Sequence, residues 1–149
     1  MIYRGMCPGE IISLTLNDVD YEKKRITVEK TTVNGKVGDV KTQSSIRYID
    51  ILPQLENMLK ELEKETGNYR NLFISHFKKP FYSHDIINLR FKELLEKINI
   101  KERSLYNLRH TFASQMISNI NNGIDILWVS KILGHKDLSV TLQYYAKYI

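Results

Sequence analysis

The stretch from Ser104 to Tyr145 constrains the fold most, because two glycines divide a helical pattern into short pieces. Apolar residues recur every three or four positions after Ser104, which predicts a helix with one apolar face. Gly123 interrupts this pattern, and Gly134 follows a second apolar run at a position typical of a left-handed helix cap. The sequence therefore predicts three successive helices here. The residues of the first apolar face are Leu105, Leu108, Phe112, Met116 and Ile120.

Side chains suited to phosphodiester chemistry lie near the ends of these helices. Arg109 can donate two hydrogen bonds to the non-bridging oxygens of a phosphate, and His135 can donate to the same group. A tyrosine hydroxyl, from Tyr144 or Tyr145, can attack phosphorus. Taken singly, a histidine after a glycine cap is usually an incidental surface residue, and a tyrosine-rich helix usually serves packing. The order and spacing of these residues must therefore carry the functional interpretation.

That order resembles the catalytic domain of the tyrosine recombinases, the phage-integrase family. The family carries a His-x-x-Arg box, then a Leu-Gly-His box, then a tyrosine nine residues beyond that histidine. In this chain Arg109 takes the place of the box arginine, and His135 completes Leu-Gly-His. Nine residues further on stands Tyr144, with Tyr145 as the alternative if the register slips by one. The resemblance implies that Tyr144 is the nucleophile, with Arg109 and His135 stabilising the phosphate.

The first box of the family, Gly-x-Arg-x-x-Glu, resembles residues 5–10, but Cys7 stands where the family has arginine. A thiol cannot present the fixed fork of charged donors that a guanidinium has. Losing one preorganised donor costs about 10²–10³ in rate elsewhere. Arg4 precedes the helix that Pro8 begins, so it is a poor substitute. Cys7 itself is expected to be a buried, small, apolar residue rather than a reactive thiol.

The second box also departs from the family, because Tyr106 stands where most relatives have histidine. A tyrosine hydroxyl can hydrogen-bond a phosphate oxygen, but with an ordinary pKa near 10 it is a poor base at neutral pH. Tyr106 is therefore interpreted as tolerated variation at a catalytic position. The neighbouring His110 is expected to be structural, with hydrogen bonds to buried backbone.

Lys41 is the residue that the resemblance assigns as general acid toward the leaving 5′ oxygen. The segment from Lys41 to Arg47 reads Lys-Thr-x-x-Ser-x-Arg, as at the family's hairpin, where the lysine enters the minor groove. Without the family, a hairpin lysine would more often be a solubilising charge, and Lys30 and Lys36 would be equally eligible.

The fold class expected is mainly α with a small antiparallel sheet, the tyrosine-recombinase catalytic-domain fold. Alternating segments 25–30 and 46–51, with a tight-turn signal at Asn34-Gly35, predict a three-stranded antiparallel meander. Residues 72–74 are expected to form a short buried strand. Helices are expected at 8–16, at 53–66 with Pro53 in its first turn, and at 83–97 with Ser83 as its cap. The apolar faces of the last two comprise Leu55, Met58, Leu59 and Leu62, and Ile86, Ile87, Phe91, Leu94 and Leu95.

Composition sets broad limits on the class of protein. The 149 residues suit one domain with a sizeable core, residues 1–149, and the net charge of +5 gives only supporting evidence for a polyanionic partner. The single cysteine excludes an internal disulfide and fits a reducing, intracellular setting. Cysteine and histidine show no metal-site spacing, and no apolar run approaches the length of a membrane span. No metal, cofactor or membrane partner is therefore expected.

The resemblance implies site-specific DNA recombination through a 3′-phosphotyrosyl intermediate, on double-stranded DNA, by a tetramer in a bacterial or phage-derived cytoplasmic setting. Relatives carry further helices before the first box and a separate DNA-binding domain. Their absence from residues 1–149 suggests an excised piece or a short reading frame. The alternative is a catalytically impaired DNA-binding or assembly remnant, since Cys7 replaces the arginine. A third and weaker alternative is a related DNA-relaxing topoisomerase.

Overall fold

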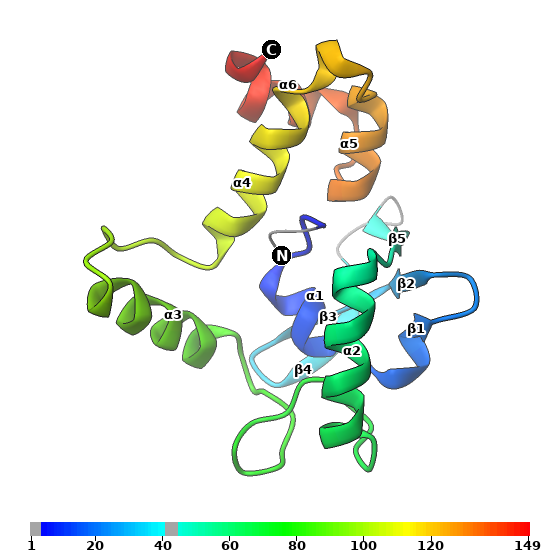
Figure 1. The fold of residues 1–149 in the computed structure, drawn as a ribbon, viewed down its shortest axis with the longest axis vertical. Helices are drawn as coiled ribbons and strands as arrows, with labels where there is room; N and C mark the ends of the chain where they lie inside the picture. The colour runs from blue at the N-terminus through cyan, green and yellow to red at the C-terminus, as the bar shows by residue number, and fades with distance from the viewer. Residues whose placement is uncertain (1–3, 41–44) are drawn as a thin grey trace. The chain divides into compact units, whose positions relative to one another are not determined.

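The computed structural model describes residues 4–40 and 45–149, which form two compact units (Figure 1). Residues 9–83 make the first unit, and residues 84–149 with the N-terminal segment up to Pro8 make the second. The fold is mainly helical with small antiparallel sheets, so the expected fold class is confirmed.

The first unit is built on a three-stranded antiparallel sheet in the order β1-β2-β5. In β2, Ile26 and Val28 point into the core, and Ile26 stands opposite the fully buried Ile49 of β5. This alternation of buried and half-exposed residues is what fixes the strand register. The elements leading through the sheet are α1 (Pro8–Ser13), η1 (Leu16–Asp18), β1 (Val19–Asp20), β2 (Arg25–Val28) and β5 (Arg47–Asp50).

A separate hairpin, β3 (Lys30–Val33) and β4 (Lys36–Asp39), lies between β2 and β5 in the sequence. Asn34 and Gly35 form its turn, and both have positive φ, at 48° and 74°. The tight turn is thus confirmed, but the expected three-stranded meander is wrong. The turn joins only β3 to β4, whereas β2 pairs directly with β5 across the whole insertion.

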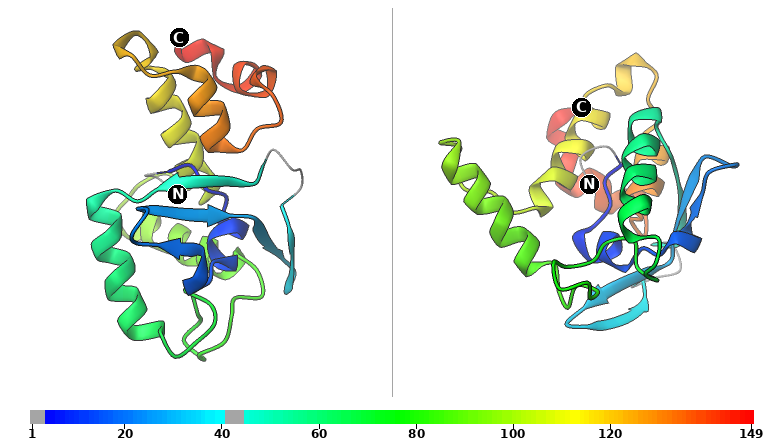
Figure 2. Two further views of the ribbon diagram at one scale, coloured as in Figure 1. Left: turned by 90° about the vertical axis from the view of Figure 1, so that its right-hand side faces the viewer. Right: turned by 60° about the horizontal axis from the view of Figure 1, so that its bottom comes forward.

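Helix α2 (Pro53–Thr66) follows β5 and lies beside the sheet (Figure 2). Pro53 occupies its first turn, and Leu59 is buried, as expected. Met58 is exposed, however, which corrects its assignment to the core. The expected strand at 72–74 is also wrong. Leu72 is fully buried and its amide donates to Leu14 O at 2.9 Å, but the segment makes only isolated bridges.

The second unit is helical and carries the predicted chain of short helices. In order these are α3 (Asp85–Lys97), α4 (Tyr106–Ile117), η3 (Ile120–Asn122), α5 (Ile126–Leu133), α6 (Leu138–Tyr145) and η4 (Ala146–Tyr148). Asp125 caps α5, Gly134 ends it at φ 69°, and Asp137 caps α6. Helices α4, α5 and α6 lie side by side (Figure 1). Their shared core is Phe112, Ala113, Ile117, Val129, Ile132, Leu133 and Tyr145.

Helix α3 differs from expectation in its cap and in its apolar face. His84, not Ser83, occupies the N-cap position. Ile86 and Leu94 are about half exposed, and only Leu95 is buried in this helix. Periodicity identifies the apolar face of a helix, but it does not say how much of that face another element covers.

Candidate active site

Arg109 is buried in the second unit, where two backbone carbonyls hold its guanidinium. It is 5% exposed, and it donates from Nη1 to Gly5 O and from Nη2 to Leu133 O, each at 2.6 Å. Among the described residues, no carboxylate forms an ion pair with it. Carbonyl oxygens accept hydrogen bonds but carry no full charge, so the positive charge of Arg109 is solvated without being neutralised.

Gly5 makes this arrangement possible because it has no side chain. Its φ is +60°, and a Cβ there would lie 2.7 Å from Phe112 Cδ1 and 2.9 Å from Leu133 Cδ2. Glycine tolerates both the left-handed backbone and the close approach. The first-box glycine therefore lets the N-terminal segment press onto α4 and α5 until its carbonyl reaches Arg109.

His135 follows the left-handed cap at Gly134 and is fixed by α6. Its Nδ1 lies 2.8 Å from Thr141 Oγ1, and Thr141 is fully buried. When Nδ1 accepts the hydroxyl proton of Thr141, the neutral ring carries its own proton on Nε2, which suits donation to an anion. Sequence reasoning missed Thr141. The only signal for it is a hydroxyl residue six positions after His135, which is a weak one.

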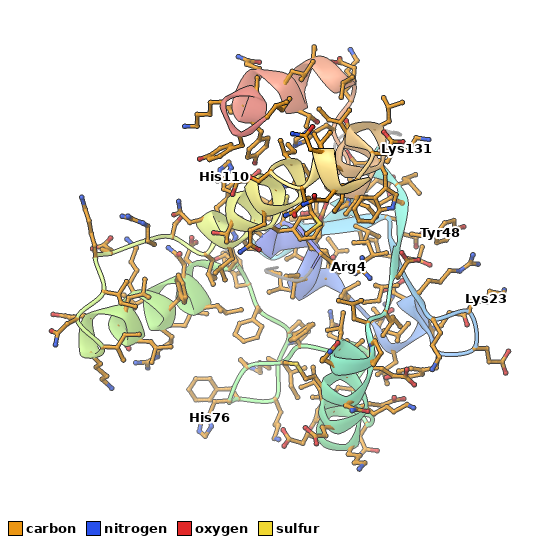
Figure 3. The ribbon with its side chains drawn as sticks, turned by 45° about the horizontal axis from the view of Figure 1, so that its top comes forward. Arg4, Lys23, Tyr48, His76, His110 and Lys131 are labelled. Carbon is orange, nitrogen blue, oxygen red and sulfur yellow. The ribbon has the colours of Figure 1, made fainter. Side chains whose placement is uncertain are left out.

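Tyr144 and Tyr145 are adjacent, but their environments are opposite. Tyr144 is 58% exposed, whereas Tyr145 is 4% exposed. The Tyr145 hydroxyl lies 2.6 Å from His110 Nδ1, on the flank of α4 that faces α6 (Figure 3). His110 therefore bonds a phenol, where a bond to buried backbone was expected. Its ring also meets the edge of Tyr106 at 5.1 Å between centroids.

Tyr106 and Cys7, the two departures from the family boxes, both lie near Arg109 or Tyr145. The Tyr106 ring centroid is 6.0 Å from Arg109 Cζ, and this side chain is exposed. Cys7 is half-buried, so it is less enclosed than expected. Burial raises the pKa of the Tyr145 phenol to about 12, and Cys7 and Tyr106 add to the rise while Arg109 opposes it. Cys7, Tyr106 and Arg109 thus all influence the pKa of Tyr145.

In the first unit, two other motif residues pair with each other. Arg47 donates from Nη1 and Nη2 to Glu10 Oε1 and Oε2 at 2.9 and 2.8 Å, and both side chains are buried. This ion pair joins the first box to the hairpin box. Lys41, the expected general acid, lies outside the described residues. Of the two other lysines considered for that role, Lys30 forms an ion pair with Asp18 at 3.0 Å, whereas Lys36 is exposed.

The geometry thus connects three of the predicted catalytic residues within the second unit. Arg109 binds the carbonyl of Leu133, His135 follows two residues later, and its ring is bonded to Thr141, one turn before Tyr144. Across the described parts of the chain, no group of His, Cys, Asp or Glu is placed to hold a metal ion. Nor does any helix within them have both the length and the apolarity to cross a membrane.

Comparison with known proteins points to one family. The model of the phage integrase family matches residues 1–148. Prophage integrase IntR of Escherichia coli K12 is 27% identical over 173 residues, which cover 99% of this chain and 41% of the relative. A XerC-like tyrosine recombinase of Caldanaerobacter subterraneus is 26% identical over 97% of this chain and 43% of the relative. The chain therefore spans less than half the length of these relatives.

Solved structures agree on the fold. The Tn1549 transposon integrase, in complex with transposon right end DNA, superposes with a TM-score of 0.83 at 22% identity, over 97% of this chain and 51% of that one. The XerA recombinase gives a TM-score of 0.75 at 25% identity, over 96% and 48%.

Proposed function

Because this chain belongs to the phage integrase family, we propose that it cleaves and rejoins double-stranded DNA in site-specific recombination, with Tyr144 as nucleophile. The observation that supports this most is the connection from Arg109 through Leu133 and His135 to the helix that presents the exposed Tyr144. Relatives named as integrases and recombinases, and the DNA complexes of the Tn1549 integrase, favour the same substrate.

In the proposed reaction, the Tyr144 oxygen attacks phosphorus and forms a 3′-phosphotyrosyl bond as the bond to the 5′ oxygen breaks. Arg109 and His135 donate hydrogen bonds to the non-bridging oxygens, where negative charge develops. Lys41 gives a proton to the leaving 5′ oxygen, and the proton that Tyr144 loses on attack passes to solvent. The Tyr106 hydroxyl can add a further hydrogen bond to the phosphate. A 5′ hydroxyl of the partner strand then reverses the step, and a tetramer on DNA would bring the strands together.

Cys7 sets the expected rate of this reaction. It stands where the family has a second phosphate-binding arginine, so one charged clamp is missing from the site as proposed. We therefore expect cleavage that is detectable in single-turnover assays and slow.

Covalent trapping on nicked DNA tests the proposal. A pool of nicked duplexes with randomised sequence is incubated with the chain, and protein-linked DNA is recovered under denaturing conditions. The wild type should trap DNA, and Tyr144→Phe should trap none because the attacking oxygen is gone. Tyr148→Phe is the matched control, since Tyr148 is another exposed tyrosine four residues away. Retention of DNA with no covalent product would favour the non-catalytic remnant instead.

A further inference from the structure

The last turn of α6 carries two adjacent tyrosines that differ in exposure and in hydrogen bonding. Tyr144 is exposed, and its hydroxyl makes no hydrogen bond with the described part of the chain. Tyr145 is buried, and its ring lies 6.3 Å from that of Tyr144 at an angle of 56°. Successive residues of a helix point about 100° apart, so fixing the direction of one tyrosine fixes the direction of the other.

The bond between Tyr145 and His110 has a defined donor and acceptor. Burial raises the pKa of Tyr145 to about 12, which keeps its phenol protonated at neutral pH. Burial and the nearby Arg109 charge lower the pKa of His110, which keeps its imidazole neutral. The phenol therefore donates to Nδ1 at 2.6 Å, and the bond is partly buried.

An open pocket lies beside this bond. The space is about 490 Å³, and Tyr144, Tyr145 and His110 all line it. Leu95 and Leu108 also line it. Tyr145 also packs in the core that α4, α5 and α6 share, and the hydrogen bond adds a directional contact to α4 on the side of the pocket.

We propose that Tyr145 is a positioning residue, whose hydrogen bond to His110 locks the last turn of α6 so that Tyr144 alone is presented to DNA. This inference rests on the proposed function, in which Tyr144 is the nucleophile. It assigns to the two neighbouring phenols distinct tasks: one attacks phosphorus, and the other holds the first in place. It also explains why Tyr145 cannot take over, since its oxygen is buried and committed to His110.

The first test removes the bond and keeps the ring. Tyr145→Phe should reduce the single-turnover cleavage rate about fivefold, because one buried hydrogen bond is worth about 1 kcal/mol. The dissociation constant for the same DNA should stay within about twofold, because the Tyr145 side chain is buried. A rate equal to that of the wild type would overturn the inference.

The second test changes the acceptor. His110→Asn places an amide oxygen near the position of Nδ1, whereas His110→Leu offers no acceptor. We expect His110→Asn to retain several times more cleavage than His110→Leu at equal DNA affinity. Equal loss in both variants would show that ring packing, not the hydrogen bond, matters, and the inference would then be wrong.

Two further readouts separate this inference from the proposed function. Mass spectrometry of the trapped peptide should find DNA on Tyr144 only; an adduct on Tyr145 overturns the positioning role while leaving tyrosine-mediated cleavage intact. Amide exchange in residues 142–146 should be several-fold faster in Tyr145→Phe than in Tyr148→Phe. Amide exchange reports on the Tyr145–His110 hydrogen bond whether or not the chain cleaves DNA. Unchanged exchange in Tyr145→Phe would therefore also overturn the positioning role.

Discussion

Arg47 and Arg109 are both buried arginines, one in each unit, and they differ in what surrounds their charge. Arg47 forms a two-bond ion pair with Glu10, so its charge is cancelled inside the first unit. Arg109 is held by the carbonyls of Gly5 and Leu133. An arginine whose charge is cancelled serves the scaffold, whereas one held by carbonyls keeps a net charge for an incoming anion.

The contrast also separates motif residues that a sequence pattern places together. Glu10 and Arg47 belong to the same family boxes as Cys7 and Lys41, yet the structure gives them a structural partnership. Motif membership is therefore not evidence of contact with DNA. The surroundings of each charge give the better criterion, and substitution can test it.

The largest expected effect is on stability, in the first unit. Arg47→Met removes the two charged hydrogen bonds that the buried Glu10 receives from Arg47, and it should lower the free energy of unfolding by about 3–5 kcal/mol. Replacing both partners, with Glu10→Leu and Arg47→Met together, should recover most of that loss. Chemical denaturation measures both values. A double variant as unstable as the single one would mean that the pair does more than cancel charge.

The second expected effect is on rate, in the second unit. Arg109→Lys keeps a positive charge but loses the planar fork, so it should reduce covalent trapping about 10²–10³-fold. Its loss of unfolding free energy should be clearly smaller than that of Arg47→Met, because no buried carboxylate is left behind. The comparison of the two arginines fails if Arg109→Lys unfolds as readily as Arg47→Met but still traps DNA.

Cys7→Arg should act in the opposite direction, with a gain in trapping of up to about 10²-fold. The substitution restores a guanidinium where the family has one, close to the cluster around Tyr145 and Arg109. Cys7→Ser is the control for loss of the thiol and should trap DNA as the wild type does. No gain with arginine would show that the site does not hold a second clamp in this chain.

The smallest effects are those of pH, and one residue in each unit illustrates them. Burial disfavours the charge of Asp18, but hydrogen bonds from Thr15 and Lys30 outweigh it and lower its pKa below 3.8. Its contribution to stability is therefore present above that pH and is lost in more acidic solution. The pKa of Tyr145 is raised from 10.0 to about 12, so its contribution is present below pH 10 and is lost as the pH rises through 12.

Amide exchange across the pH range checks both effects. Protection around Asp18 should fall in acid, and protection around Tyr145 should fall in alkali. Asp18→Asn and Tyr145→Phe should each reduce the corresponding local pH dependence. Unchanged pH dependence in both variants would count against these assignments.

Short-range sequence signals predict most of the helices, strands and turns. The turn at Asn34-Gly35, the helix start at Pro53 and the cap at Gly134 all depend on the conformational preferences of one or two residues. The β2–β5 pairing depends on residues about twenty positions apart, which a local pattern cannot specify. Exposure of Met58 depends on what covers α2, which is equally non-local.

The candidate site divides in the same way. The order of the boxes identified Arg109, His135 and Tyr144 in advance, and their assignment as catalytic residues stays a prediction. The side-chain contacts around them could not be predicted from the sequence. The contacts of Thr141 with His135 and of Tyr145 with His110 do not follow from the spacing of the family motifs. Catalytic residues are therefore easier to predict from a sequence than the residues that hold them in position.

The close packing around Gly5 limits which residues can replace it. Adding a single methyl group would displace Phe112 or Leu133, and Leu133 carries a carbonyl that holds Arg109. A saturation screen scored for recombination should therefore find Gly5 as intolerant as the nucleophile, although glycine offers no functional group. Alanine at this position would impair the proposed cleavage by shifting the carbonyl groups that hold Arg109, although Gly5 lies 104 positions before that arginine in the sequence.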